Sequence, residues 1–219
     1  MTVSSFGLMK TEAATAVGGP PQSRREQREA TRARLLQIAV TVLIERGVAG
    51  TTTLEVQQRA GVSRGALLHH FPTHAQLLSA TVGELVRRNE EHIWREQARA
   101  AVDADPLASA IRILTAASAH ASYLAELELW AVARTDAQLR EALHTAEREA
   151  LRENERVMAQ LFAAVSDRPG CSAVVSLSIE FARGLALSDV LRRDPLKREQ
   201  LIERWIRAAR LMIDHPSEP

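Results

Sequence analysis

The segment Gly61-Val62-Ser63-Arg64-Gly65 holds the residues whose types and spacing most directly suggest chemistry. It matches G-x-S-x-G, the pattern in which an α/β-hydrolase presents a nucleophilic serine on a sharp turn after a strand. The same arginine can instead donate two hydrogen bonds to a guanine edge in the DNA major groove. The residues around the segment must decide between an esterase-type enzyme and a DNA-reading surface.

The residues that precede this segment disfavour the enzyme. A nucleophile elbow needs an apolar strand before the serine and a βα architecture around it. Here Val56-Gln57-Gln58-Arg59-Ala60 is polar and has a helical pattern, and no later segment alternates with the period of a strand. The hydrolase remains the alternative, and we predict no catalytic residues.

Metal and cofactor chemistry is also weakly supported. Glu141-Ala142-Leu143-His144 fits the Glu-x-x-His pattern of di-iron bundles, but such a site needs two copies and the chain has one. His69 and His70 are adjacent, so on a helix they point about 100° apart and cannot easily share an ion. The single cysteine, Cys171, excludes an internal disulfide and a cysteine-type zinc site. We predict no metal and no cofactor.

Capping signals around the segment predict two short helices. Thr52 and Glu55 form a capping box for a helix to about Ala60, and Ser63 can cap a second helix that ends before Phe71-Pro72. Gly61 can take the left-handed conformation of the turn between them. Two short helices joined in this way predict a helix-turn-helix, whose second helix enters the major groove.

The apolar residues of this motif give it an inside and an outside. We expect Leu54, Val56 and Ala60 to face a preceding helix, and Leu67 with Phe71 to anchor the second helix. The outward residues of the second helix are then Ser63, Arg64, Gly65, Leu68 and His69. Small residues at its start let the backbone approach the groove, where Arg64 can contact guanine.

The remaining chain is also predicted to be helical, to about Ile213. An apolar stripe ends at Gly47, and Thr73 with Gln76 caps a long helix to about Arg99. Thr135 with Gln138 predicts a helix that ends at Arg168-Pro169-Gly170. Asp105-Pro106 and Asp194-Pro195 each place proline after an N-cap. The fold class is therefore all-α, with about nine helices.

Charge and hydrophobicity indicate the kind of partner and the cellular compartment. The net charge is +1, but residues 1–75 carry nine Lys and Arg against five Asp and Glu, which hints at an anionic partner. Five arginines in residues 24–34 could track phosphates, or could form a solvated helix start. No apolar run approaches the ~18 residues of a membrane span, and residues 1–22 lack a secretory pattern. We expect a soluble cytoplasmic protein without a membrane partner.

The segment from about Thr31 to Val86 resembles the DNA-binding domain of the TetR/AcrR family of transcriptional regulators. The resemblance is carried by the first helix ending in Gly47, by the Thr51–Thr53 cluster, by Ala60–Gly65, and by His69–Pro72 followed by a capped helix. Leu127–Asp136 and Phe181–Leu187 are similar to C-terminal domains of the family. The resemblance implies an N-terminal three-helix helix-turn-helix domain and a larger helical ligand-binding and dimerisation domain.

Carried over by position, the resemblance implies roles for individual residues. Thr53 matches a phosphate contact, Arg64 a base-reading position and His70 a backbone contact. Leu68 stands where the family usually has tyrosine, and His74 where it commonly has lysine. The predicted DNA-binding set is Thr52, Thr53, Ser63, Arg64, Gly65, Leu68, His69, His70 and His74.

Two wide apolar faces near the C-terminus predict a homodimer built as a four-helix bundle. The candidate interface residues are Phe181, Leu185, Leu201, Trp205, Ala208 and Met212. A dimer would place two reading helices in successive major grooves of a near-palindromic operator in double-stranded DNA, roughly 34–36 Å apart.

The resemblance also implies a small, largely apolar effector among the middle helices. Candidate pocket residues, which combine apolar surface with polar tips, are Trp94, His120, Tyr123, Trp130, Met158 and Phe162. The expected division is a disordered leader at 1–22, the helix-turn-helix domain at 23–72, a connecting helix at 73–100, and the effector-binding and dimerisation domain at 101–219. The expected function is a dimeric repressor that an effector releases from DNA.

Overall fold

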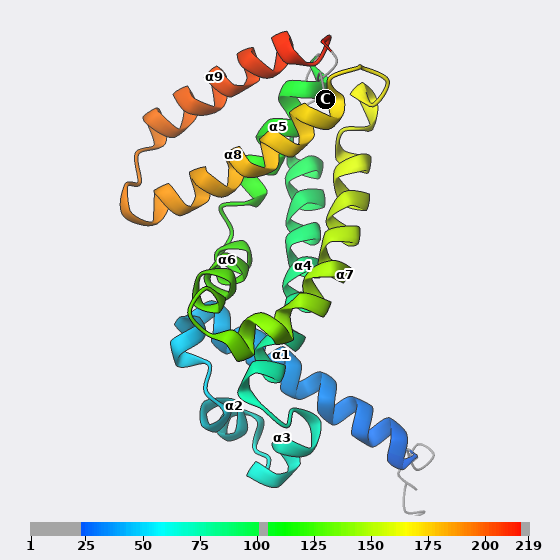
Figure 1. The fold of residues 1–219 in the computed structure, drawn as a ribbon, viewed down its shortest axis with the longest axis vertical. Coiled ribbons are helices and arrows are strands. Elements are labelled where there is room, and N and C mark those ends of the chain that lie inside the picture. Colours follow the sequence, from blue (N-terminus) through cyan, green and yellow to red (C-terminus); the bar gives the residue numbers. More distant parts are fainter. Residues whose placement is uncertain (1–22, 101–104, 216–219) are drawn as a thin grey trace, which may run out of the picture.

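The computed structural model describes residues 23–100 and 105–215, and this part of the chain is entirely helical (Figure 1). It contains no strand there, so the all-α prediction is confirmed. The helices are α1 (Arg24–Gly50), α2 (Thr53–Ala60), α3 (Arg64–His70), α4 (His74–Arg99), α5 (Pro106–Ala117), α6 (Ala121–Ala133), α7 (Ala137–Leu161), the 3₁₀ helix η1 (Ala163–Val165), α8 (Cys171–Leu191) and α9 (Pro195–Met212). The predicted leader at 1–22 lies outside the described residues.

The helices α1, α2, α3 and the start of α4 form a small unit at one end of the molecule, which we call the reading head (Figure 1). Its core is wholly apolar and consists of Leu35, Ala39, Val56, Ala60, Leu67, Phe71 and Leu77. These side chains come from all four helices, so burial of this cluster fixes the angle between α2 and α3.

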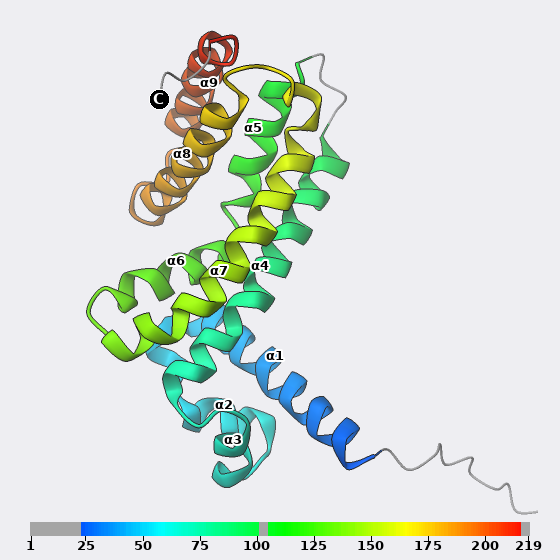
Figure 2. The same cartoon turned by 45° about the vertical axis from the view of Figure 1, so that its right-hand side comes forward.

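Two long helices connect the reading head to the rest of the molecule. The helices α4 and α7 run side by side in both views, and α6 lies across them near the head (Figures 1 and 2). A second apolar cluster joins α1, α4, α6 and α7. The head therefore shares its first helix with the core of the larger domain.

The helices α8 and α9 form a paired arm at the end opposite α2 and α3 (Figure 2). Both pack against α5, and a third apolar cluster fills the space among α4, α5, α7, α8 and α9. No helix in the described part of the chain is both long enough and apolar enough to cross a membrane.

Most predicted helix starts are confirmed. The side chains of Ser63, Thr73, Asp105 and Asp194 each accept a backbone N–H at the predicted N-cap. The first helix begins at Arg24, because Ser23 and Glu26 form a capping box. Two details were wrong. Asp136, not Thr135, caps α7, since its carboxylate accepts from Leu139 N. That helix ends at Leu161.

The orientation predicted for Leu54 was also wrong. Its side chain is 58% exposed, whereas Val56 and Ala60 are buried as expected. The Thr52 capping box is only half formed, because the Glu55 carboxylate accepts from Arg59 Nε instead of the N-cap backbone. The short helix α2 therefore buries a narrower face than the sequence pattern indicates.

Candidate nucleic-acid interface and cavity

The start of α3 presents an unpaired arginine to solvent. Arg64 is the first residue of the helix, is exposed, and forms no ion pair with the described residues. The Ser63 hydroxyl accepts a hydrogen bond from Ala66 N at 3.2 Å, so it serves as the N-cap. Gly65 follows Arg64 and is also exposed, so the backbone at the start of α3 is open to solvent.

The hydrolase interpretation of this segment is wrong. The helix α2 precedes Ser63, where a nucleophile elbow requires a strand. Gly61 lies between the two helices with φ 62°, the left-handed conformation of a helix C-cap. The segment is therefore the turn of a helix-turn-helix.

The first residue of α4, His74, contacts the backbone just before the N-terminus of α2. His74 Nε2 lies 2.6 Å from the carbonyl oxygen of Thr51, and since a carbonyl only accepts, this nitrogen carries the proton. The Thr52 hydroxyl accepts from Glu55 N at 3.1 Å, and Thr53 is half-buried directly after it. The exposed His74 thus binds the backbone of Thr51, just before α2.

The C-terminal end of α3 carries the two histidines, whose rings meet edge to face at 5.5 Å. His69 is exposed and His70 half-buried. Burial, and then the positive charges of His69, Arg28 and Arg32, lower the pKa of His70. Two arginines of α1 therefore lie close enough to add charge to the surface of α3.

Leu68 does not face fully outward as predicted. It is half-buried and packs against the core of the reading head, since it lies one position after the core residue Leu67. The exposed surface of α3 is therefore narrower than the predicted set and centres on Ser63, Arg64, Gly65 and His69.

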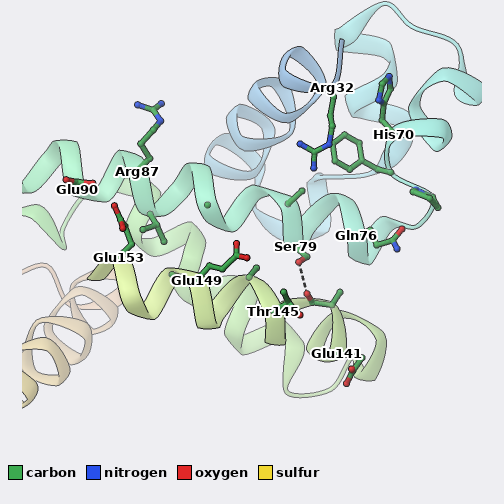
Figure 3. Close-up of a pocket in the computed structure, with 18 residues that line it drawn as sticks. Arg32, His70, Gln76, Ser79, Arg87, Glu90, Glu141, Thr145, Glu149 and Glu153 are labelled. Carbon is green, nitrogen blue, oxygen red and sulfur yellow. Dashed lines mark hydrogen bonds between the residues drawn. The ribbon is translucent and has the colours of Figure 1, made fainter. Parts of the chain in front are cut away.

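A groove of 890 Å³ runs from the reading head between α4 and α7. Figure 3 shows Arg32 and His70 at one end and the carboxylates Glu149 and Glu153 further along. Ser79 Oγ donates to the Ala142 carbonyl at 2.7 Å and closes its floor. Its lining is strongly charged, which is unlike an apolar ligand site.

A second cavity, of 560 Å³, lies among α4, α5, α6, α7 and α8. Three of the six predicted pocket residues, Tyr123, Trp130 and Met158, line it. The other three do not. Trp94 packs against the core and donates to Glu90, Phe162 is buried in that core, and His120 stacks on His92 with ring centroids 3.6 Å apart.

The cavity also contains carboxylates that the sequence reasoning missed. Glu126 is only 4% exposed and accepts from Asn89 Nδ2 at 2.7 Å. Burial, reinforced by the nearby charge of Glu147, raises the pKa of Glu126 to about 7. Burial also raises the pKa of Glu147, which accepts from Trp130 Nε1 at 2.6 Å. The sequence signal that could have identified Glu126 is its position inside the largely apolar segment Ala121–Ala133.

The helix α6 connects this cavity to the reading head. Tyr123, Glu126 and Trp130 line the cavity, whereas Glu128 faces the other way. Glu128 Oε1 accepts from Val48 N at 2.8 Å, where Gly47 interrupts α1 with φ 70°. One helix therefore touches both the cavity and the end of α1.

Of the predicted dimer residues, Leu185 is buried within one protomer and the other five are half-buried. Phe181 and Trp205 stack at 5.7 Å, Trp205 Nε1 donates to Ser178 Oγ, and Leu185 is buried. Leu201, Ala208 and Met212 are half-buried. The free apolar surface of the arm consists of Leu187, Val190, Leu191, Leu196 and Leu211, of which Leu191 is 89% exposed.

Comparison with known proteins agrees with this architecture. The family model described as "Bacterial regulatory proteins, tetR family" matches residues 35–81, which span most of the reading head. An uncharacterized HTH-type transcriptional regulator of Mycobacterium tuberculosis is 37% identical over 122 residues. That match covers 56% of this chain and 63% of the relative, so the chain spans less than two thirds of its length.

Two further relatives match over nearly their whole length. The HTH-type transcriptional regulator CymR of Pseudomonas putida is 27% identical over 86% of this chain and 94% of CymR. The crystal structure of a transcriptional regulator from Rhodococcus sp. Rha1 has a TM-score of 0.62 at 21% identity, over 84% of this chain and 97% of that one. Residues 35–81 thus match the TetR family of bacterial regulatory proteins, and the chain is similar in sequence to HTH-type transcriptional regulators and in fold to a solved regulator.

Proposed function

We propose that the protein is a sequence-specific DNA-binding regulator of transcription that acts in the cytoplasm. The observation that carries the proposal is the exposed N-terminal end of α3, where Arg64 has no ion-pair partner within the described residues. In a helix-turn-helix, residues at this end of the second helix contact base edges. Thr52 and Thr53 at the start of α2, with His69 and His70, supply phosphate contacts around Arg64.

The regulator acts as a homodimer on a near-palindromic operator. Support comes from the arm, where the exposed leucines of α8 and α9 leave an apolar surface that one protomer does not cover. A second copy, related by a two-fold axis, covers this surface in a four-helix arrangement. The interface is therefore centred on Leu187 and Leu191 instead of Trp205.

A small molecule in the cavity of 560 Å³ weakens DNA binding and so relieves repression. The path runs through α6, because Tyr123 and Trp130 of that helix line the cavity and Glu128 binds the backbone of α1. A shift of α6 on ligand binding changes the position at which α1 packs against it. The distance between the two reading heads then changes. Coupling of ~1–3 kcal/mol would change operator affinity about 5- to 150-fold.

The Arg64→Ala variant tests the proposal. Sites selected from random DNA with the wild-type protein are compared with random duplex in a mobility-shift competition. Because one bidentate contact to guanine contributes ~1–3 kcal/mol, the variant is expected to lose about 5- to 150-fold of the discrimination. Arg152→Ala, at an exposed arginine of α7, is the matched control and keeps it. Unchanged discrimination by Arg64→Ala would refute the assignment of α3.

A further inference from the structure

The cavity holds two carboxylates that form no ion pair with a cation of the described residues. Glu126 accepts from the amide of Asn89 at 2.7 Å, and Glu147 accepts from the indole N–H of Trp130 at 2.6 Å. Both donors are neutral. Within residues 23–100 and 105–215, neither carboxylate takes part in an ion pair. A buried carboxylate without a counter-charge is unfavourable, so these two carboxylates lack an ion-pair partner in the cavity.

The nearest cation is already engaged. Arg183 Nη1 donates to both carboxylate oxygens of Glu180, at 2.6 and 2.5 Å. Its guanidinium lies 4.6 Å above the ring of Trp130, a cation–π arrangement. It lowers the pKa of Glu126 and of Glu147 only against the larger effect of burial. Arg183 therefore acts on these carboxylates through its charge but forms its ion pair with Glu180.

Among the described residues that line the cavity, two buried side-chain atoms have no hydrogen-bond partner, the acceptor Asn89 Oδ1 and the donor Arg183 Nε. The amide nitrogen of Asn89 binds Glu126, so the free acceptor lies beside this carboxylate. Such an oxygen and the adjacent carboxylate are both acceptors, so one group carrying N–H bonds or positive charge would satisfy both.

The walls of the cavity suit a large apolar body. Ile93, Leu114 and Met158 supply aliphatic surface, and Tyr123 and Trp130 supply aromatic rings. The charged lining residues are the carboxylates Glu90, Glu126, Glu147 and Glu180 against Arg148 and Arg183, with His144 beside them. Of these carboxylates, Glu90 pairs with Arg156 and Glu180 with Arg183. Glu126 and Glu147 are thus the carboxylates of the lining without an ion pair among the described residues, and the cation of the lining that also has none, Arg148, is exposed.

We propose that this cavity binds a lipophilic organic cation, an amine or quaternary ammonium carried on an aromatic body, with Glu126 as its counter-charge. Glu147 is the second carboxylate of the site, and Trp130 and Tyr123 hold the aromatic body. The proposal rests on the proposed effector-responsive function and names the chemical class of its effector. A neutral or anionic ligand would leave the buried Glu126 and the half-buried Glu147 without a counter-charge.

A matched pair of dyes tests the charge requirement. The full-length protein without DNA is titrated by calorimetry with thioflavin T, a permanent cation, and with its uncharged benzothiazole analogue that lacks the ring N-methyl group. Wild-type protein is expected to bind the cation at least about 30-fold more tightly, since an unpaired buried charge costs at least ~2 kcal/mol. The Glu126→Gln variant is expected to lose about 30-fold in affinity for the cation and less than about 3-fold for the neutral dye.

Two variants separate charge from folding. Glu147→Gln should weaken cation binding in the same direction, which provides a second readout if Glu126→Gln unfolds. The control variant is Glu149→Gln. Glu149 lines the groove between α4 and α7, outside the cavity, so this variant should leave the affinities for both dyes unchanged. Equal binding of the two dyes by wild-type protein, no binding of the cation, or full cation affinity in both cavity variants would overturn the proposal.

The same reagents keep this proposal apart from the effector-responsive function. If thioflavin T binds through Glu126 but leaves the operator complex intact, the cation site stands and effector control by this cavity fails. If the neutral dye alone releases the operator, effector control stands and the cation site fails.

Discussion

The reading head and the cavity domain bury polar groups in opposite ways. The head encloses apolar side chains and the buried Thr51, whose hydroxyl donates to the carbonyl of Gly47. The cavity domain encloses Glu126, and the polar atoms Asn89 Oδ1 and Arg183 Nε have no hydrogen-bond partner among the described residues. On the proposed function, the head binds its partner on its outer surface. The cavity domain binds its partner inside, where Glu126 has no counter-charge among the described residues.

The arm gives the largest expected effect and could break this division. The Leu187→Glu variant places a charge on an apolar surface that two protomers would bury, so we expect monomers by sedimentation. A monomer loses the gain from two linked reading heads, and operator affinity should fall by about 10²- to 10⁴-fold. The exposed Leu151 of α7 provides the control variant Leu151→Glu, which should remain dimeric. A dimeric Leu187→Glu protein would place the interface elsewhere.

The pH dependence of stability sharpens the contrast. The pKa of Glu126, about 7 in the fold, lies above its ordinary 4.5, so folding favours the protonated carboxyl. Its stabilising contribution is full below pH 4.5 and is lost as the pH rises to about 7. At ~1.4 kcal/mol per pKa unit, the loss in the free energy of unfolding is up to about 3 kcal/mol.

Denaturant titrations at pH 5 and pH 8 measure this loss. The Glu126→Gln variant cannot ionise, so it should show a flatter profile and exceed the wild type in stability at pH 8. Glu149→Gln should follow the wild-type profile. A Glu126→Gln profile parallel to that of the wild type would mean that this carboxylate is not the buried acid.

The smallest expected effect concerns the contact between the two regions. Glu128→Gln keeps an acceptor for Val48 N but removes its charge, which should weaken the bond by about 1 kcal/mol. We expect the ligand-dependent change in operator affinity to alter about fivefold, while ligand affinity without DNA stays the same. Titration of operator binding with and without a cavity ligand measures it. A variant with wild-type ligand response would remove α6 from the path.

The sequence predicted the reading head well because its determinants are local. The N-cap serine, the glycine of the turn and the buried Leu67 and Phe71 lie within a few positions of one another. The exceptions also have local causes. Leu54 follows the helical pattern, but α2 is only two turns long and has one buried face. Leu68 depends on a small rotation of α3 that periodicity does not resolve.

The cavity was predicted less completely because its lining comes from five helices distant in sequence. Residue type alone identified Tyr123 and Trp130 as candidate pocket residues. It could not distinguish these two aromatic residues from Phe162, which is buried in the core. The carboxylates were missed since a glutamate in a helix is usually exposed. Only the packing of α4, α6 and α7 reveals that Glu126 is enclosed.

On the proposed function, the kink in α1 lies where the strength of the response can change independently of ligand and DNA specificity. Gly47 has positive φ, and a Cβ atom there would lie 2.7 Å from Glu128 Oε1. Backbone shape and one carboxylate thus meet at a point remote from the cavity lining and from Arg64. On the proposed function, changes at this point would adjust the gain of the response while leaving the choice of small molecule and of DNA sequence untouched. An engineer could therefore tune the dose range of a biosensor without redesigning its specificity.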